Sequence, residues 1–136
     1  MIEMTLAIAE AVVRAAQAKA KELGCPITVS VVDEGARLVL CARGDGASIF
    51  TTDTSRAKAI PAAVYKKPTA ELLELAKAGS PFYNTLPALF QGEVLLSLGG
   101  APICRGGRVI GGIGCGGGNA EQDHQCAIAG AAAAGG

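Results

Sequence analysis

Half of the twenty residues from position 99 to 118 are glycine, and this stretch limits the possible fold more than any other feature. Ile103 precedes the pair Gly106–Gly107, and Ile110 and Ile113 follow it. Isoleucine favours strands, and adjacent glycines supply the positive φ angles that a two-residue hairpin turn needs. The stretch is therefore predicted to form a β-hairpin with little side-chain bulk.

After this hairpin, the chain passes through Gly116–Gly118, which we call the glycine-rich corner, into a predicted terminal helix. Asn119 is a favourable N-cap, and Asp123 places negative charge in the first turn. Backbone N–H groups at such a junction are expected to be open to an anion or a polar ligand atom. The glycines are equally compatible with tight turns and close packing. Although Gly112–Gly117 fits G-x-G-x-x-G, it is not followed by a further strand with an acidic residue about 20 positions on, so a dinucleotide site is not expected.

The rest of the sequence predicts the element order α-β-β-α-α-β-β-β-α. Hairpins near both ends favour a single α+β domain over residues 1–136, in which helices pack on an antiparallel sheet of about five strands. Pro61 is expected to kink the second helix. The predicted elements are a helix capped by Thr5 and stopped at Gly24, strands 27–32 and 37–42, a helix from Ser48 or Thr52 to Tyr65, a helix 69–79, a loop 80–84, a helical turn 86–90, a strand 94–98, the glycine-rich hairpin and the terminal helix.

The charge balance excludes several classes of partner. Twelve basic and 12 acidic side chains cancel, aromatic residues are scarce and tryptophan is absent, so neither nucleic acid nor an anionic membrane is an expected partner. No secretory pattern and no apolar run of about 18 residues occurs. We therefore expect a cytoplasmic protein, and its core of small residues favours a homo-oligomer.

The cysteine and histidine content limits metal and disulfide chemistry. The five cysteines are odd in number and include no C-x-x-C pair, which indicates neither a disulfide framework nor a zinc site. The single histidine, His124, excludes a multi-histidine metal site within one chain. No metal site is expected.

Three residues are candidates for catalysis. Cys115 lies just before the terminal helix, where the helix dipole lowers a thiol pKa, although cysteine is also common as a small buried apolar residue. Lys58, one turn after Thr54 and among apolar neighbours, is either a desolvated base or an ordinary surface cation. Asp123 is either an acid–base group or a carboxylate that stabilises the helix dipole.

Six segments occur in one order along the chain, at residues 31–38, 43–47, 57–59, 99–103, 107–114 and 122–123. Together they resemble the GlcG/HbpS family of small bacterial domains, which is related to the PduO C-terminal domain. The resemblance implies a profilin-like α+β fold, homo-oligomeric assembly and, in some members, haem or related tetrapyrrole binding. Similar domains accompany corrinoid enzymes and diol or glycolate utilisation operons. The motif positions carried over are Arg43, Asp45, Lys58, Gly114, Gly117 and Asp123.

The first hypothesis is a binding domain for haem or another small carboxylated molecule at the glycine-rich corner. The ligand carboxylates would meet Arg43, Thr54, Lys58 and the amides of Gly116, Gly117 and Gly118. Haem would also require an axial donor, for which the candidates are His124, Tyr83 and Cys115.

Two alternatives stay open. The first is a cofactor-independent enzyme, an isomerase, lyase or hydrolase, in which Lys58 or Asp123 moves a proton, Cys115 is the nucleophile or acid, and the glycine amides stabilise an oxyanion. The second is an interaction scaffold without a ligand, which would have a glycine-rich corner that is packed shut.

Overall fold

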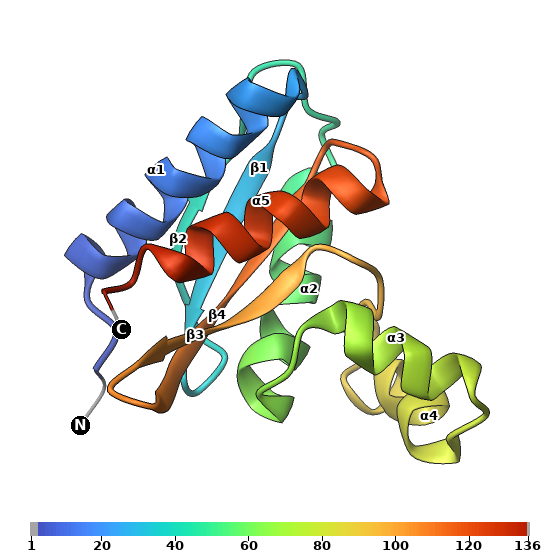
Figure 1. Cartoon of the computed structure of the whole chain (residues 1–136). Helices are drawn as coiled ribbons and strands as arrows, with labels where there is room; N and C mark the ends of the chain where they lie inside the picture. The colour runs from blue at the N-terminus through green and yellow to red at the C-terminus, as the bar shows by residue number, and fades with distance from the viewer. Residues whose placement is uncertain (1–2, 136) are drawn as a thin grey trace.

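The computed structural model describes residues 3–135, which form an α+β fold with an antiparallel sheet (Figure 1). The strand order within these residues is β2-β1-β4-β3, and every neighbouring pair is antiparallel. The elements are α1 (Leu6–Leu23), β1 (Thr28–Asp33), β2 (Leu38–Ala42), α2 (Thr51–Tyr65), α3 (Thr69–Lys77), α4 (Pro81–Leu89), β3 (Gly100–Arg105), β4 (Arg108–Gly116) and α5 (Ala120–Ala132).

Helices cover both faces of the sheet. In Figure 1, α1 and α5 lie side by side in front of the sheet, and α2 lies behind it. The front core contains alternate residues of the central strands, including Val29, Val31 and Ile113, packed against α1 and α5. The rear core contains Val32 with α2 residues such as Ala59. The period of two along β1 therefore sends successive side chains into two different cores.

Local signals in the sequence form helix α1 and the turn between β3 and β4 as predicted. Thr5 caps α1 by accepting a hydrogen bond from the Ile8 N–H at 3.1 Å, and Gly24 ends the helix at φ 72°. Gly106 and Gly107 join β3 to β4 with φ values of 57° and 75°. Both hairpins and the capped α1 are therefore confirmed.

The glycines of β4 allow α2 to pack directly on the backbone of the sheet. Gly112 and Gly114 point toward α2, and an added Cβ would collide with the carbonyl oxygens of Ala59 and Ser55 respectively. The same layer contains polar contacts, because Ser30 and Ser55 share a hydrogen bond between their hydroxyls at 2.7 Å. The G-x-G pattern on this strand is thus explained by close packing.

The prediction of about five strands is wrong, because the described residues form four and residues 94–98 are not a strand. The N–H of Leu95 instead donates to the carbonyl oxygen of Ala57 in α2 at 3.0 Å. That oxygen lacks its usual helical partner, since Pro61, four residues later, has no N–H. Pro61 lies buried inside α2, and the helix continues past it to Tyr65.

Residues 80–84 are also not the predicted loop. Ser80 caps α4 by accepting a hydrogen bond from the Tyr83 N–H, and Pro81 occupies the first helical position, where its missing N–H is harmless. The helical turn predicted at 86–90 is the second half of this helix.

Within residues 3–135, no helix combines the length and apolar character needed to cross a bilayer.

Candidate functional site

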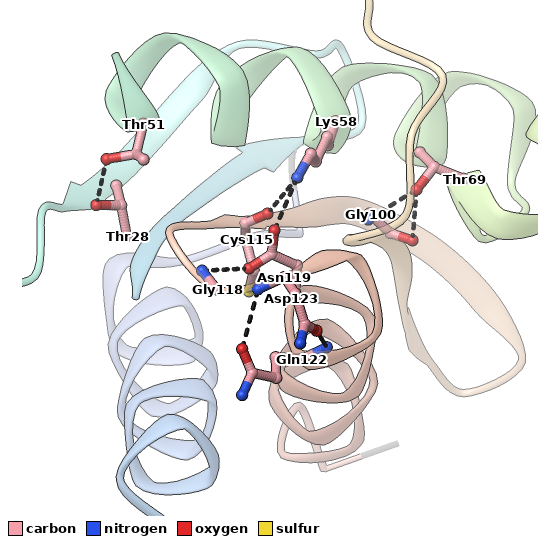
Figure 2. A network of polar contacts seen from close by, with 10 residues as sticks. All are labelled: Thr28, Thr51, Lys58, Thr69, Gly100, Cys115, Gly118, Asn119, Gln122 and Asp123. Atoms are coloured by element: carbon pink, nitrogen blue, oxygen red, sulfur yellow. Dashed lines mark hydrogen bonds and ion pairs between the residues drawn. The ribbon is translucent and has the colours of Figure 1, made fainter. Parts of the chain in front are cut away.

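Hydrogen bonds within the chain occupy the backbone N–H groups where the glycine-rich corner enters α5 (Figure 2). The N–H of Gly118 donates to Asp123 Oδ1 at 2.9 Å. The N–H of Asn119 donates to Gln122 Oε1 at 2.9 Å, and the N–H of Gln122 donates back to Asn119 Oδ1 at 2.8 Å, which completes a capping box. The expectation that these amides stay available to a ligand is therefore wrong for Gly118.

The other residues predicted to bind a ligand differ in how far the chain covers them. An added Cβ on Gly117 would lie 2.9 Å from the carbonyl oxygen of Pro26, so the chain covers this glycine. Thr54 is half-buried, and its Oγ1 lies 3.1 Å from where a Cβ of Gly116 would stand. Arg43 is exposed on the loop after β2. A binding role for these residues stays a prediction.

Lys58, Cys115 and Asp123 meet at one point, although they are far apart in the sequence. Figure 2 shows Lys58 Nζ donating to the carbonyl oxygen of Cys115 at 2.9 Å and to Asp123 Oδ2 at 3.2 Å. The Lys58 and Asp123 side chains are 7% and 6% exposed, so this ion pair is buried. Gly99 makes room for it, because an added Cβ there would lie 3.0 Å from Asp123 Cβ and 3.1 Å from Lys58 Cδ.

This arrangement holds three elements together and offers little room for chemistry on a substrate. The partner that Cys115 contributes is its backbone oxygen, and its side chain is fully buried in the front core. Desolvation raises the pKa of Asp123, while the Lys58 charge and the Gly118 N–H oppose that rise. The enzyme hypothesis that uses these three residues is therefore not favoured.

The thiol pKa values also depart from the sequence expectation. Burial, and then the neighbouring Cys126 thiol, raises the pKa of Cys115 well above its ordinary value. The prediction that the helix dipole lowers it is wrong. Burial likewise raises the pKa of Cys126 to about 12.

Within the part of the chain that the structure describes, no group of three histidine, cysteine or acidic side chains is placed to hold a metal ion.

The three candidate axial donors lie in different surroundings. Cys115 is sealed in the core. Tyr83 packs edge-on against Tyr65 and Phe82, with ring centroids 6.0 Å and 5.0 Å away, in an aromatic cluster of α2 and α4. His124, on α5, borders an open surface groove between α1 and α5, which we call the α1–α5 groove.

The α1–α5 groove has a volume of about 440 Å³. His124 lines it, and the Nδ1 atom of this side chain is buried without a hydrogen-bond partner among residues 3–135. Ile128, one turn along α5, is 44% exposed and gives the groove an apolar side. Lys19 of α1 provides a cation and forms an ion pair with Glu22 at 3.3 Å. The lining residues are Lys19, Glu121, His124, Gln125, Ile128 and Ala129.

Sequence reasoning identified His124 but missed Lys19 and Ile128. A signal for Ile128 exists, because residues 121, 124, 125 and 128 share one face of a helix and place an apolar side chain beside the single histidine. Lys19 carried no comparable signal, since its position beside α5 depends on how two helices from opposite ends of the chain pack.

Comparison with known proteins shows a family model and curated relatives that this chain matches. The family model described as "Haem degrading protein HbpS-like" matches residues 4–132. An uncharacterised 15.0 kDa protein from the dhaT–dhaS intergenic region of Citrobacter freundii is 36% identical over 89% of this chain and 84% of its own length. The corrinoid adenosyltransferase PduO of the same organism is 33% identical over 84% of this chain, but the chain spans only 34% of that protein.

A solved structure is similar over nearly the full length. The crystal structure of a PduOC–haem complex has a TM-score of 0.86 and 32% identity to this chain, and the match covers 96% of this chain and 94% of that one. This chain is thus similar in fold, over nearly its whole length, to a protein whose crystal structure is a haem complex.

Proposed function

This chain belongs to the HbpS-like family, and from that membership we propose that it binds haem, or a related tetrapyrrole, in the α1–α5 groove. The family model spans almost the whole chain, and the similar PduOC structure is a haem complex. The finer claim concerns where the ligand lies, and it is supported by the residues of the groove.

The groove residues suit the three chemical parts of haem. Imidazole nitrogen is a common iron ligand, and His124 would supply it. The Nδ1 atom is buried without a protein partner in the described chain, so the nitrogen offered to iron would be Nε2. Ile128 and Ala129 would contact the apolar macrocycle, and Lys19 would meet a propionate, using ammonium donors beyond the one that Glu22 accepts.

One observation favours this groove over the glycine-rich corner. The imidazole of His124 lines an open groove beside a half-exposed isoleucine, whereas the corner amide of Gly118 is already hydrogen-bonded to Asp123. Haem iron would supply redox and gas-binding chemistry when bound, and His124 would orient it. Homo-oligomeric assembly and a cytoplasmic location remain predictions.

Titration with ferric haem tests the proposal. We expect a Soret shift that saturates at one haem per chain, because one histidine supplies the axial nitrogen. His124→Ala should weaken binding by about tenfold or more and change the spectrum, since the variant loses the iron–nitrogen bond. Lys19→Gln should weaken binding by a few-fold without changing the spectrum, because it removes only a carboxylate contact.

Tyr83→Phe and Cys115→Ser are the matched controls, since these residues are the other candidate donors. Both variants should keep the wild-type spectrum and affinity. A spectral change in Tyr83→Phe together with none in His124→Ala would move the axial site to α4. Absence of any saturable Soret shift in the wild-type protein would overturn the haem proposal itself.

A further inference from the structure

Helices α1 and α5 are in direct contact in front of the sheet (Figure 1). An added Cβ on Gly130 of α5 would lie 3.0 Å from the carbonyl oxygen of Val12 and 3.3 Å from the Cβ of Ala16, both in α1. Further along α1, Lys19 lines the α1–α5 groove together with Glu121, which lies near the start of α5. The two helices therefore run in opposite directions, and the end of α1 lies beside the first turns of α5.

This arrangement brings two cysteines together at the end of α1. Cys126 lies one turn before Gly130 on α5, so it faces the last turns of α1. Cys25 directly follows Gly24, and its N–H donates to the carbonyl oxygen of Ala20 at 3.0 Å, which holds it at that same end. The Cys25 side chain packs against the front core that contains Cys126, and the two thiols lie within hydrogen-bonding reach of each other.

The thiols of this core differ in their access to solvent. Cys25 is half-buried, whereas Cys126 is fully buried. Cys115, which belongs to the same core, is fully buried as well. A small oxidant from solution therefore reaches Cys25 first, and the thiol beside Cys25 is that of Cys126.

We propose that Cys25 and Cys126 form a dithiol pair that hydrogen peroxide oxidises to a disulfide, which links the end of α1 to α5. The Cys25 thiolate attacks one peroxide oxygen, the O–O bond breaks, and the departing hydroxide takes up a proton to become water. The Cys126 sulfur then attacks the resulting Cys25 sulfenic acid. An S–S bond forms, the S–O bond breaks, and the hydroxide leaves with the Cys126 proton as a second water. Two thiols and one peroxide thus give one disulfide and two waters.

Proximity allows a buried thiol to take part in the second step. Burial disfavours the Cys126 thiolate, which slows its attack on the sulfenic acid. The two sulfurs are held on the same core, however, so the step is intramolecular and its effective concentration is high. The peroxide needs to reach only Cys25. A disulfide that forms in this way is expected to be reversible, as is usual for redox-responsive pairs inside cells.

The test is oxidation of the reduced protein by hydrogen peroxide without added haem, followed by peptide mass spectrometry under non-reducing conditions. We expect one linked pair of peptides, Cys25 with Cys126, and dithiothreitol should reverse the link. Its rate should not depend on protein concentration, because the bond forms within one chain. In Cys126→Ala, Cys25 should instead accumulate as the sulfenic acid, and dimedone should trap several-fold more of it than in the wild type.

Cys41→Ser is the matched control, because Cys41 is also half-buried but lies opposite Ser30 on the face of the sheet that α2 covers. This variant should form the link as the wild type does. A link from Cys25 to Cys115, a link between chains, or conversion of Cys25 to sulfinic acid without any link would overturn the pairing. A Cys25 thiol that peroxide leaves unmodified would overturn the site. These outcomes are read from the thiols, so they do not depend on haem binding.

Discussion

Cys115 shows two opposing influences on a single thiol. Its position just before α5 favours the thiolate, whereas full burial disfavours any charge. Burial dominates, and the pKa rises. The sequence shows where the helix begins, but burial of this thiol depends on α1 and α5 packing over β4, which no local pattern records.

Thiol reactivity should follow this burial. With iodoacetamide at pH 8, we expect the exposed Cys104 to react first, while Cys115 and Cys126 react only when the protein unfolds. Mass spectrometry of the peptides over time measures the order. Modification of Cys115 as fast as Cys104 in the folded protein would contradict the burial argument.

Stability should fall in the alkaline range for the same reason. The ordinary thiol pKa is 9.0 and that of Cys126 in the folded protein is about 12, so between these values the folded state keeps a proton that the unfolded state loses. The contribution is therefore complete below about pH 9 and is lost at up to about 1.4 kcal/mol per pH unit as the pH rises toward 12. Urea unfolding at pH 8 to 10.5 measures the slope, and Cys126→Ala should reduce it. An unchanged slope would be inconsistent with this assignment.

At the scale of elements, local signals in the sequence predicted most of the fold. The caps of α1 and α5 and the turn between β3 and β4 follow from Thr5, Asn119 and the paired glycines Gly106–Gly107. The segment around Leu95 was mispredicted as a strand, because its apolar residues suit either a sheet or the surface of α2. Whether the segment joins the sheet or lies on α2 depends on the Ala57 carbonyl oxygen, which Pro61 leaves without a helical partner. The hydrogen bond that settles this joins Ala57 and Leu95, which are 38 positions apart in the sequence.

Packing of α2 on β4 should depend on the missing side chains of that strand. Gly114→Ala would drive a Cβ into the carbonyl oxygen of Ser55, and backbone cannot move aside as a side chain can. We expect a loss of at least about 3 kcal/mol in the free energy of unfolding, measured by urea denaturation. Gly35→Ala is the control, because the nearest atom would lie at 3.4 Å and its φ is not positive. Equal stability of the two variants would show that α2 does not need this close approach.

At the scale of the whole molecule, the Lys58–Asp123 ion pair joins the two helical layers. Lys58 belongs to α2 behind the sheet, and Asp123 belongs to α5 in front of it. The sequence pointed to both residues and to Cys115 as candidates for catalysis, whereas in the structure they make a buried ion pair and a contact to the backbone. Their pairing could not be predicted, because 65 positions separate the two charges and Gly99 makes the space in which they meet.

Breaking this pair should destabilise the whole molecule. Lys58→Met leaves the Asp123 carboxylate buried without its cation, and we expect a loss of about 3–5 kcal/mol by urea denaturation. Lys58→Met combined with Asp123→Leu should recover much of that loss, because no charge then stays buried. Lys77→Met, which breaks the exposed pair with Glu74, should cost less than about 1 kcal/mol. If the single and double variants of the buried pair are equally unstable, the charge itself is not what matters.

The buried pair also restricts how this protein can diverge. A mutation at position 58 or 123 alone leaves an unpaired charge in the interior. Related proteins that have lost one of these two charged residues are therefore expected to have lost the other as well. Position 99 joins them, because any residue larger than glycine there closes the space in which the two side chains touch. The residues at positions 58, 99 and 123 should therefore change together among related sequences.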